Sequence, residues 1–238
     1  TPTIRGVFLK VNEPGFEFQA GQYVNVDFPG IDGPRAFSLA SAPSESLLEL
    51  NIRLVEGGAA TTFVHEQLQP GATLGFSGPL GRFFVRKSAP EPILFLAGGS
   101  GLSSPKSMIM ELLEAGDDRP ITLVYGARNE AELYYRDLFE ALADEHANFT
   151  YVPALSEPED GGGWTGETGY VHEVAERHFD GRFDGHKAYL CGPPAMIDAC
   201  ITSLMRGRLF EEHIYMESFL SAADADKPAR RSALFKKF

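Results

Sequence analysis

The sequence predicts two parts of different fold class: a small antiparallel β-barrel over residues 1–90, then an α/β domain with a five-stranded parallel sheet over residues 91–238. Two observations predict this division. The first part contains short apolar runs that Gly and Pro separate at close spacing, which is typical of an antiparallel barrel. From Pro92 onward, apolar runs alternate with segments of helical periodicity, which is typical of a parallel sheet with helices on both faces.

The first part is expected to hold five strands and one helix. The helix covers Ala59–Gln69, because it follows two glycines and places Phe63, Val64 and Leu68 on one side. The expected strands are Ile4–Val11, Gln22–Phe28, Ala36–Ala40, Leu48–Val55 and Thr73–Ser77.

The second part is expected to alternate strands and helices. An apolar run at Ile93–Ala97 leads through a glycine loop into a helix that ends near Leu113. Residues 157–168 contain three consecutive glycines among polar side chains, which predicts a loop. The other expected strands are Ile121–Tyr125, Phe149–Ala154, Lys187–Cys191 and His213–Glu217, and the other helices are Glu130–Ala143, Val171–Phe179 and Pro194–Met205.

Composition excludes several classes of function. The net charge of -12 argues against binding of nucleic acid, which needs a basic surface. No apolar run approaches the ~20 residues of a membrane span. The two cysteines, Cys191 and Cys200, are too few for a disulfide framework, which indicates the reducing cytoplasm. The six histidines lack metal-site spacing, so no metal is expected.

A glycine loop, Gly98-Gly99-Ser100-Gly101, joins the first strand of the second part to its helix. Glycines let the backbone bend sharply, and the free N–H groups at the helix start attract an anion such as a pyrophosphate. A tight turn that binds nothing has the same local sequence, because the full G-x-G-x-x-G spacing is absent.

Two stretches of the first part suggest a second anion site. Arg35 and Phe37 are two residues apart in an expected strand, so a guanidinium and an aromatic ring share one face and can hold a phosphate and a ring system. The glycines before Ala59 lead into a helix with hydroxyl groups in its first turns. The alternatives are an ordinary edge strand with a surface arginine, and a plain capped helix.

Three segments of the second part meet at one edge of the predicted sheet. Gly98–Gly101, Gly126–Arg128 and Cys191–Pro194 all follow strands, and ligands of parallel sheets lie beyond the carboxyl ends of the strands. This convergence favours a nucleotide site. Cys191 either contacts a bound ring there or is a buried structural thiol, which is the commoner fate of a free cysteine.

Together these motifs resemble the ferredoxin–NADP⁺ reductase superfamily. The flavin motif R-x-[YF]-S-x-x-S is matched from Arg35 to Ser41, the nucleotide loop G-G-x-G from Gly98 to Gly101, and C-G-P-P-x-M from Cys191 to Met196. Within that superfamily the chain is most similar to the reductase components of bacterial multicomponent phenol hydroxylases. The resemblance implies a barrel that binds FAD and an α/β domain that binds NADH.

The resemblance also implies roles for single residues of the first part. Arg35 is expected to hold the FAD pyrophosphate, Phe37 to stack on the isoalloxazine ring, and Ser38 to donate a hydrogen bond near flavin N5. Phe37 stands where tyrosine is commoner. The other residues expected to contact FAD are Ala36, Ile52, Arg53, Leu54, Gly58, Ala59, Ala60, Thr61 and Phe219.

In the second part the resemblance assigns Cys191 and Glu217, with Ser38, to the catalytic set beside the nicotinamide. Arg128 favours the 2′-phosphate of NADPH and Glu130 and Glu132 repel it, so the charges alone leave the choice of nucleotide open. The resemblance favours NADH. The residues expected to bind the dinucleotide are Gly98, Gly99, Ser100, Gly101, Arg128, Cys191, Gly192, Pro193 and Met196.

The expected partners follow from the same resemblance. A [2Fe-2S] ferredoxin domain is absent from this chain and is expected upstream of Thr1, and a diiron hydroxylase that acts on phenol is the expected final electron acceptor. Two alternatives stay open: the reductase of another oxygenase, acting on toluene, alkenes or methane, and a regulatory nucleotide-binding module without flavin.

Overall fold

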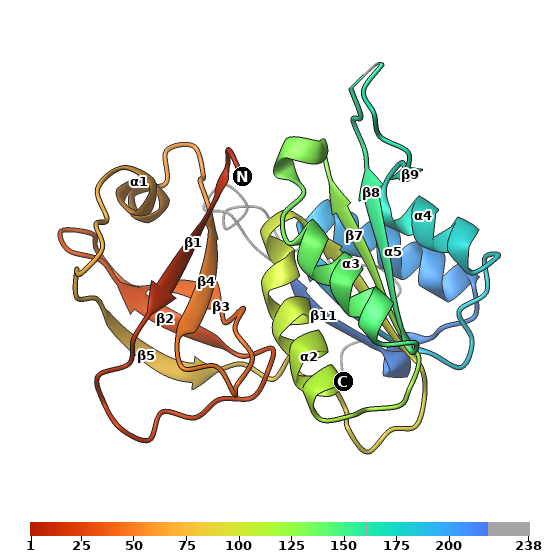
Figure 1. Cartoon of the computed structure of the whole chain (residues 1–238), viewed down its shortest axis with the longest axis horizontal. Helices are drawn as coiled ribbons and strands as arrows, with labels where there is room; N and C mark the ends of the chain where they lie inside the picture. Colours follow the sequence, from red (N-terminus) through yellow and green to blue (C-terminus); the bar gives the residue numbers. More distant parts are fainter. Residues whose placement is uncertain (160, 219–238) are drawn as a thin grey trace. The chain divides into compact units, whose positions relative to one another are not determined.

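The structure, a computed structural model, describes residues 1–159 and 161–218. Its residues cluster into two compact units (Figure 1), which we call the barrel unit and the sheet unit. The barrel unit contains Thr1–Ser88 and Leu102–Asp117, and the sheet unit contains Ala89–Gly101 and the described residues from Asp118 onward. The helix after the glycine loop therefore groups with the barrel. We retain the division after residue 90 as a proposal about the domains.

The barrel unit contains two small antiparallel sheets. One pairs β1 with β4, the other has the order β3-β2-β5, and an isolated bridge between Leu39 and Leu50 links the two. Their strands are β1 (Ile4–Leu9), β2 (Tyr23–Asp27), β3 (Arg35–Ser38), β4 (Leu48–Arg53) and β5 (Gly75–Leu80). This confirms an antiparallel, barrel-like first part, because all its strand pairs run in opposite directions.

Alternate strand residues form the core of the barrel unit. Val24 and Val26 of β2 and Leu50 and Ile52 of β4 are almost fully buried, as the two-residue period of a strand requires. Helix α1 (Ala59–Glu66) adds Val64 to the same cluster. The apolar spacing in the sequence therefore identified the side of this helix on which Val64 is buried.

The sheet unit has one parallel sheet of six strands in the order β11-β10-β6-β7-β8-β9. The strands are β6 (Ile93–Gly98), β7 (Ile121–Ala127), β8 (Phe149–Leu155), β9 (Glu167–Thr168), β10 (Lys187–Gly192) and β11 (Ile214–Ser218). The five expected strands are present, and β9 is an addition. Its two residues lie in the segment expected to be a loop, and they pair with Ala154 and Leu155 at the edge of the sheet.

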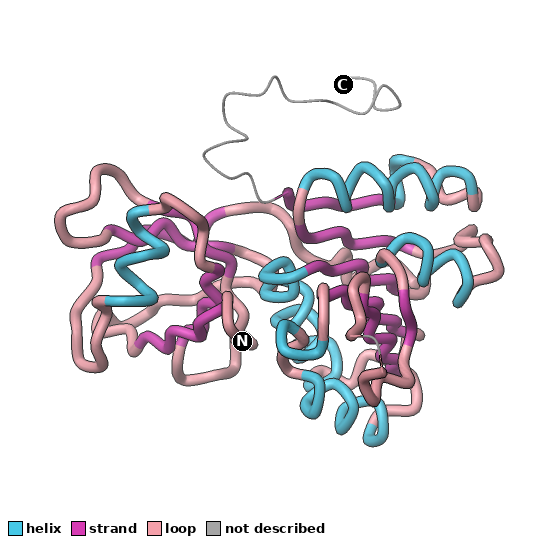
Figure 2. The backbone as a smooth tube through the Cα atoms, turned by 90° about the horizontal axis from the view of Figure 1, so that it is seen from above, coloured by secondary structure: helices cyan, strands magenta, loops and turns pink. Residues whose placement is uncertain are grey.

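Helices cover both faces of this sheet (Figure 2). Helices α4 (Val171–His178) and α5 (Pro194–Arg206) pack on one face, where Leu94 and Leu190 point. Helix α3 (Arg136–Glu145) packs on the other face through Phe139, whose ring lies 5.2 Å from that of Tyr151 on β8. No described helix is long and apolar enough to cross a membrane.

The helix expected at Glu130–Ala143 begins later. A short 3₁₀ turn, η2 (Glu130–Glu132), occupies its start, and Asn129 caps that turn by accepting the Glu132 N–H at 3.2 Å. Tyr135 then has a φ of 59°, a left-handed conformation that separates η2 from α3. The apolar spacing is correct from residue 136 on, but the local capping at Asn129 overrides it before that point.

Candidate functional site

The two glycines before α1 open its N-terminus. Gly57 has a φ of 70°, and a Cβ on Gly58 would lie 2.8 Å from Thr61 Oγ1, so both positions favour glycine. Thr61 Oγ1 donates to the Gly58 carbonyl at 3.0 Å and accepts the Val55 N–H at 3.1 Å. Gly58, the N-cap of α1, provides no side-chain cap for the first N–H groups of this helix.

Strand β3 carries the expected flavin motif, and its burial differs from simple alternation. Arg35 and Ala36 are both exposed, Phe37 is half-buried and Ser38 is buried. The guanidinium of Arg35 turns back on its own loop, where Nη1 donates to the carbonyls of Asp32, Gly33 and Pro34 at 2.9–3.1 Å. Arg35 and Phe37 therefore start from one face of the strand, but only Phe37 packs on the barrel.

A chain of aromatic rings connects the motif strand with α1. The ring of Phe28 meets Phe37 edge-on at 6.0 Å and Phe63 of α1 at 5.9 Å. Phe37 therefore has one ring edge fixed by the core while part of its surface stays exposed. The structure brings the motif strand and the start of α1 into one rigid cluster.

The third predicted flavin segment lies at the end of β4. Ile52 is buried in the core, Arg53 is half-buried, and Leu54, just beyond the strand, is exposed over 38% of its surface. His65 of α1 contacts the Ile52 carbonyl through Nε2 at 2.9 Å, which ties this strand to the helix. Only Arg53 and Leu54 present side chains that an external group reaches. Phe219 lies outside the described residues.

In the sheet unit, the glycines of the nucleotide loop allow close packing of the protein on itself. A Cβ on Gly101 would collide with the Cys191 carbonyl and lie 2.7 Å from the Gly192 Cα. A Cβ on Gly98 would lie 2.5 Å from the sulfur of Met196, which also packs against Gly192. The loops after β6 and β10 are thus in contact along their backbones, and the predicted segments around Gly98 and Cys191 form one cluster.

Two tyrosines hold the carbonyl of Gly99. Tyr125 of β7 and Tyr134, just after η2, both donate their hydroxyl groups to this oxygen, at 3.4 and 3.2 Å. Gly99 itself has a φ of 54°. Sequence reasoning did not single out either tyrosine, because the contact depends on the position of η2 next to the loop. The two hydroxyls orient the loop so that its N–H groups face away from them.

Cys191 and Glu217 are neighbours across β10 and β11. The two strands pair in parallel with these residues in register, and the Cys191 thiol donates to Glu217 Oε2 at 3.9 Å. Cys191 is fully buried, whereas Glu217 is partly exposed. The strand order thus brings together the two residues that the resemblance had paired.

Arg128 lies at the carboxyl end of β7 and is exposed. Its Nη2 forms an ion pair with Glu132 Oε1 at 3.3 Å, one helical turn further along the chain. The guanidinium therefore already has a carboxylate partner. Among the described residues, no cluster of three side chains has the composition of a metal site.

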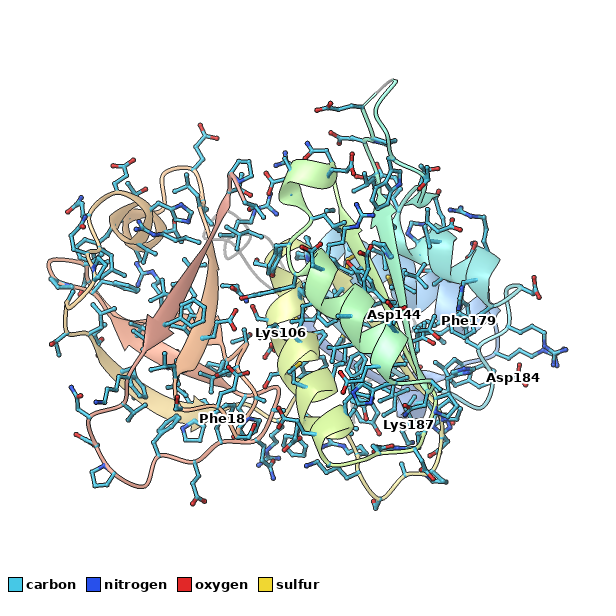
Figure 3. All side chains as sticks on the ribbon, in the orientation of Figure 1. Phe18, Lys106, Asp144, Phe179, Asp184 and Lys187 are labelled. Carbon is cyan, nitrogen blue, oxygen red and sulfur yellow. The ribbon has the colours of Figure 1, made fainter. Side chains whose placement is uncertain are left out.

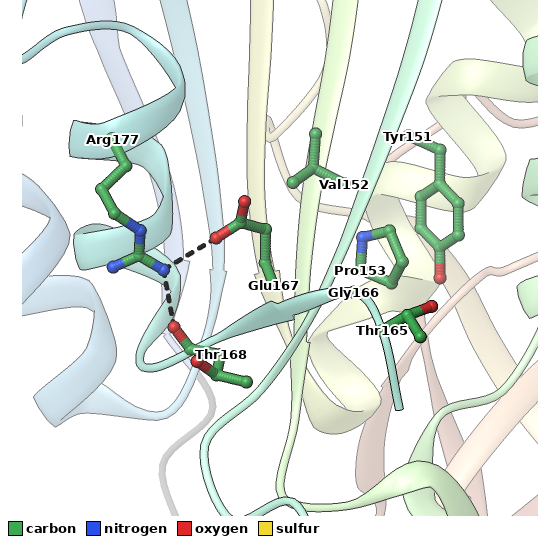
Figure 4. Close-up of a pocket in the computed structure, with 8 residues that line it drawn as sticks. All are labelled: Tyr151, Val152, Pro153, Thr165, Gly166, Glu167, Thr168 and Arg177. Carbon is green, nitrogen blue, oxygen red and sulfur yellow. Dashed lines mark hydrogen bonds and ion pairs between the residues drawn. The ribbon is translucent and has the colours of Figure 1, made fainter. Parts of the chain in front are cut away.

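A pocket of about 460 Å³ opens where β9 joins β8 (Figure 4). Residues 151–153 and 165–168 line it, and Arg177 of α4 closes one side by donating to Glu167 Oε2 at 2.8 Å and to the Thr168 carbonyl at 2.6 Å. Burial raises the pKa of Tyr151 well above its usual range, so its hydroxyl stays protonated. No predicted site residue lines this pocket, and no motif in the sequence marks it.

Comparison with known proteins supports the two half-sites. Residues 4–85 match the model of the oxidoreductase FAD-binding domain, and residues 95–201 match that of the oxidoreductase NAD-binding domain. The chain is 60% identical over 238 residues to the reductase component of phenol 2-monooxygenase, DmpP, from Pseudomonas sp. strain CF600, covering 100% of this chain and 67% of that protein. It is 59% identical to the phenol hydroxylase P5 protein of Acinetobacter pittii, with the same 67% coverage of that protein.

The chain belongs to the family of phenol hydroxylase reductase components. It spans about two thirds of the length of these relatives. Among solved structures, the cytochrome P450 reductase GcoB of Amycolatopsis matches with a TM-score of 0.85 and 32% identity, over 92% of this chain and 66% of that one. A ferredoxin NADP⁺ reductase from Neisseria gonorrhoeae matches with a TM-score of 0.77 and 22% identity, over 92% and 93% of the two chains, which supports the fold alone.

The residues of this family member fit both cofactors. On the barrel unit, the uncapped start of α1, the exposed Arg35 and the half-exposed ring of Phe37 suit the phosphates and the flat ring of FAD. On the sheet unit, the glycine loop at the carboxyl end of β6 suits the pyrophosphate of NAD, because residues without a Cβ allow a phosphate to come close.

We predict that Gly101→Ala disrupts the nucleotide half. The new methyl group collides with the Cys191 carbonyl, and backbone atoms cannot move aside as a flexible side chain can. Such overpacking costs about 1–3 kcal/mol, and the loop displacement should weaken NADH binding about tenfold. Thermal denaturation and titration with NADH measure the two effects. Gly163→Ala is the matched control, since nothing lies near its Cβ; equal behaviour of both variants would contradict the prediction.

Proposed function

We propose that this chain is the flavin- and nicotinamide-binding part of a phenol hydroxylase reductase. It takes a hydride from NADH and passes electrons, through a [2Fe-2S] cluster outside this chain, to a diiron hydroxylase that acts on phenol. The observation that carries this proposal is 60% identity with DmpP along the whole chain. Relatives that serve other oxygenases are more distant: 34% for an anthranilate 1,2-dioxygenase component and 33% for a propane 2-monooxygenase reductase.

FAD, when bound, supplies the chemistry that accepts a hydride and releases electrons singly. The chain supplies binding and orientation. Arg35 and the free N–H groups of α1 hold the negative phosphates, and these contacts are charge-assisted. Phe37, its edge fixed against Phe28, offers a ring face for stacking. Arg53 and Leu54 complete this side, and Ser38 provides a buried hydroxyl next to the ring.

The nicotinamide side depends on Cys191 and Glu217. The thiol donates to the carboxylate, so each side chain restrains the orientation of the other at the ends of β10 and β11. We propose that this pair contacts the nicotinamide and sets its orientation, which lowers the barrier by excluding unproductive poses. The glycine loop holds the pyrophosphate in the same arrangement.

NADH is the proposed nucleotide. Arg128 is engaged by Glu132, and Glu130 adds a second negative charge to the same turn. A 2′-phosphate would have to displace Glu132 and approach two carboxylates, at an electrostatic cost. The 2′-hydroxyl of NADH carries no such charge. We further propose a cytoplasmic location, since both cysteines are free and buried and NADH is an intracellular nucleotide.

Colour provides the first test. The purified chain, supplied with FAD, should bind it, turn yellow and bleach when NADH is added without oxygen, as followed by absorbance near the flavin bands. A chain that binds no FAD would support the alternative of a flavin-free regulatory module. Reconstitution with a [2Fe-2S] ferredoxin and candidate hydroxylases then decides between phenol and the toluene, alkene or methane alternatives by the rate of substrate-coupled NADH oxidation.

Cys191→Ala should slow hydride transfer more than it weakens NADH binding. Loss of the thiol frees Glu217 and loosens the nicotinamide, so we expect the rate of flavin reduction at saturating NADH to fall about tenfold, with the dissociation constant changed less than about threefold. Anaerobic stopped-flow absorbance measures both. Cys200→Ala is the control, because Cys200 lies within α5 and not at the end of a strand. Burial raises the pKa of its thiol to about 12. An unchanged reduction rate in the Cys191 variant would refute this role.

Glu132→Gln should relax nucleotide choice toward NADPH. The change releases Arg128 and removes one negative charge near the position of a 2′-phosphate. The ratio of kcat/KM for NADPH to that for NADH is expected to rise about fivefold or more. Glu140→Gln breaks another pair with the i, i+4 spacing, to Arg136 on α3, and should leave the ratio unchanged. The same ratio in both variants would argue against Arg128 as the determinant.

A further inference from the structure

Helix α2 carries a lysine that is buried in the barrel unit. Figure 3 labels this residue, Lys106, on α2 (Ser103–Glu114). Its Nζ donates to Glu49 Oε2 of β4 at 2.9 Å and to the carbonyl of Ala40 at 3.0 Å. The Lys106 and Glu49 side chains are only 5% and 3% exposed. Buried ion pairs are rare on account of the cost of removing both charges from water, so this pair needs a reason beyond simple packing.

Further contacts on α2 reach the turn that contains Ala40. Ser107 Oγ donates to the Ser41 carbonyl at 2.6 Å, and Ser41 Oγ accepts the Glu49 N–H at 3.1 Å. Two turns later on the helix, Glu114 Oε2 accepts the hydroxyl of Ser44 at 2.6 Å. Lys106, Ser107 and Glu114 thus bind residues 40–44 at three points, and we call these contacts the α2 clamp.

The clamp holds the end of the predicted flavin motif. Ala40 and Ser41 follow Ser38 directly along the chain, and Ser41 is the last residue of the R-x-F-S-x-x-S motif. Both polar groups of Ser41 are engaged within the protein, by Ser107 and Glu49. Within the motif, Ser41 therefore helps to hold α2 in place on the barrel unit.

The same helix is the continuation of the nucleotide loop. Gly101 belongs to the sheet unit, but the next residue, Leu102, already groups with the barrel unit, and Lys106 follows it by one helical turn. Because a helix is stiff over its first turns, the position of Leu102 depends on where Lys106 and Ser107 are held. The start of α2, which follows the nucleotide loop along the chain, is thereby hydrogen-bonded to the residues that follow the flavin strand, within the barrel unit.

We propose that Lys106 is a positioning residue for hydride transfer. Its ion pair with Glu49 and its bond to Ala40 hold the end of the flavin strand on α2, so that this strand and the start of the helix after the nucleotide loop move as one body. This inference rests on the proposed NADH–flavin reaction. It predicts that loss of the clamp lowers the rate of the chemical step while each cofactor still binds.

The test uses the intact chain with FAD and the double variant Lys106→Met/Glu49→Met. Replacing both charges by apolar side chains of similar length avoids an unpaired buried charge, which would unfold many proteins. The expected result is a flavin content and an NADH dissociation constant within about twofold of wild type, and a flavin reduction rate at saturating NADH about tenfold lower. Anaerobic stopped-flow measurements and a titration separate the rate from the affinity.

Ser107→Ala provides a milder, uncharged variant. It removes only the bond to the Ser41 carbonyl, so the chain should fold, and the reduction rate should fall about threefold at unchanged NADH affinity. This variant decides the question if the double variant fails to fold.

The control is Lys87→Met/Glu111→Met. It removes another ion pair of α2, 2.9 Å long, that does not involve residues 40–44. The control should reduce its flavin at the wild-type rate. Reduction rates within twofold of wild type in the clamp variants would overturn the proposal. A lower melting temperature with an unchanged reduction rate would overturn it as well. A wild-type chain that NADH fails to reduce would instead refute the proposed function, so the two failures are distinguishable.

Discussion

The close contact of two backbones at Gly101 is the constraint on which the nucleotide half depends. Only a residue without Cβ lets the loop after β6 lie against Cys191 and Gly192 at the end of β10. The contact brings the glycine loop and the start of α5 to neighbouring positions on one sheet edge. It also leaves Cys191 at the strand end, in register with Glu217 of β11. Glycine in this loop therefore serves the packing of the protein on itself.

The barrel half follows a different principle, in which apolar packing restrains a polar surface. Phe28 fixes one edge each of Phe37 and Phe63, so the motif strand and α1 hold constant positions. The groups left over at the surface are those that an anionic cofactor needs: uncapped N–H groups, an exposed guanidinium and part of an aromatic ring. Rigidity in the core thus prepares an arrangement of donors before any ligand arrives, which reduces the entropy lost on binding.

Sequence reasoning was most successful where structure depends on local periodicity. The strands of both units and the buried side of α1 follow directly from apolar spacing. The two-residue strand β9 was missed, because Glu167 and Thr168 carry no apolar pattern and pair only through their backbones. The start of α3 was wrong, because capping by Asn129 and the left-handed Tyr135 interrupt a pattern that is otherwise helical.

The features of the candidate site also fall into those that the sequence predicts and those that it does not. Glycine loops and strand ends were readable from the sequence, since topology alone brings the carboxyl ends of parallel strands together. The pairing of Cys191 with Glu217 was not, because it depends on β11 lying next to β10, and strand order has no local signal; it came only from the family resemblance. The three carbonyls that engage Arg35, and the two tyrosines on Gly99, are likewise tertiary contacts that no spacing predicts.

The buried pair of Lys106 and Glu49 illustrates what such contacts add. Apolar side chains of similar volume would give comparable stability at this position, because the Coulomb attraction in a buried pair is largely offset by desolvation. Apolar packing, however, tolerates small shifts of one element along the helix. The Lys106 ammonium group does not, because it must lie near 3 Å from both a carboxylate and the Ala40 carbonyl. The pair is thus best explained by the register it imposes. A reaction between two flat rings depends on such register more strongly than folding does.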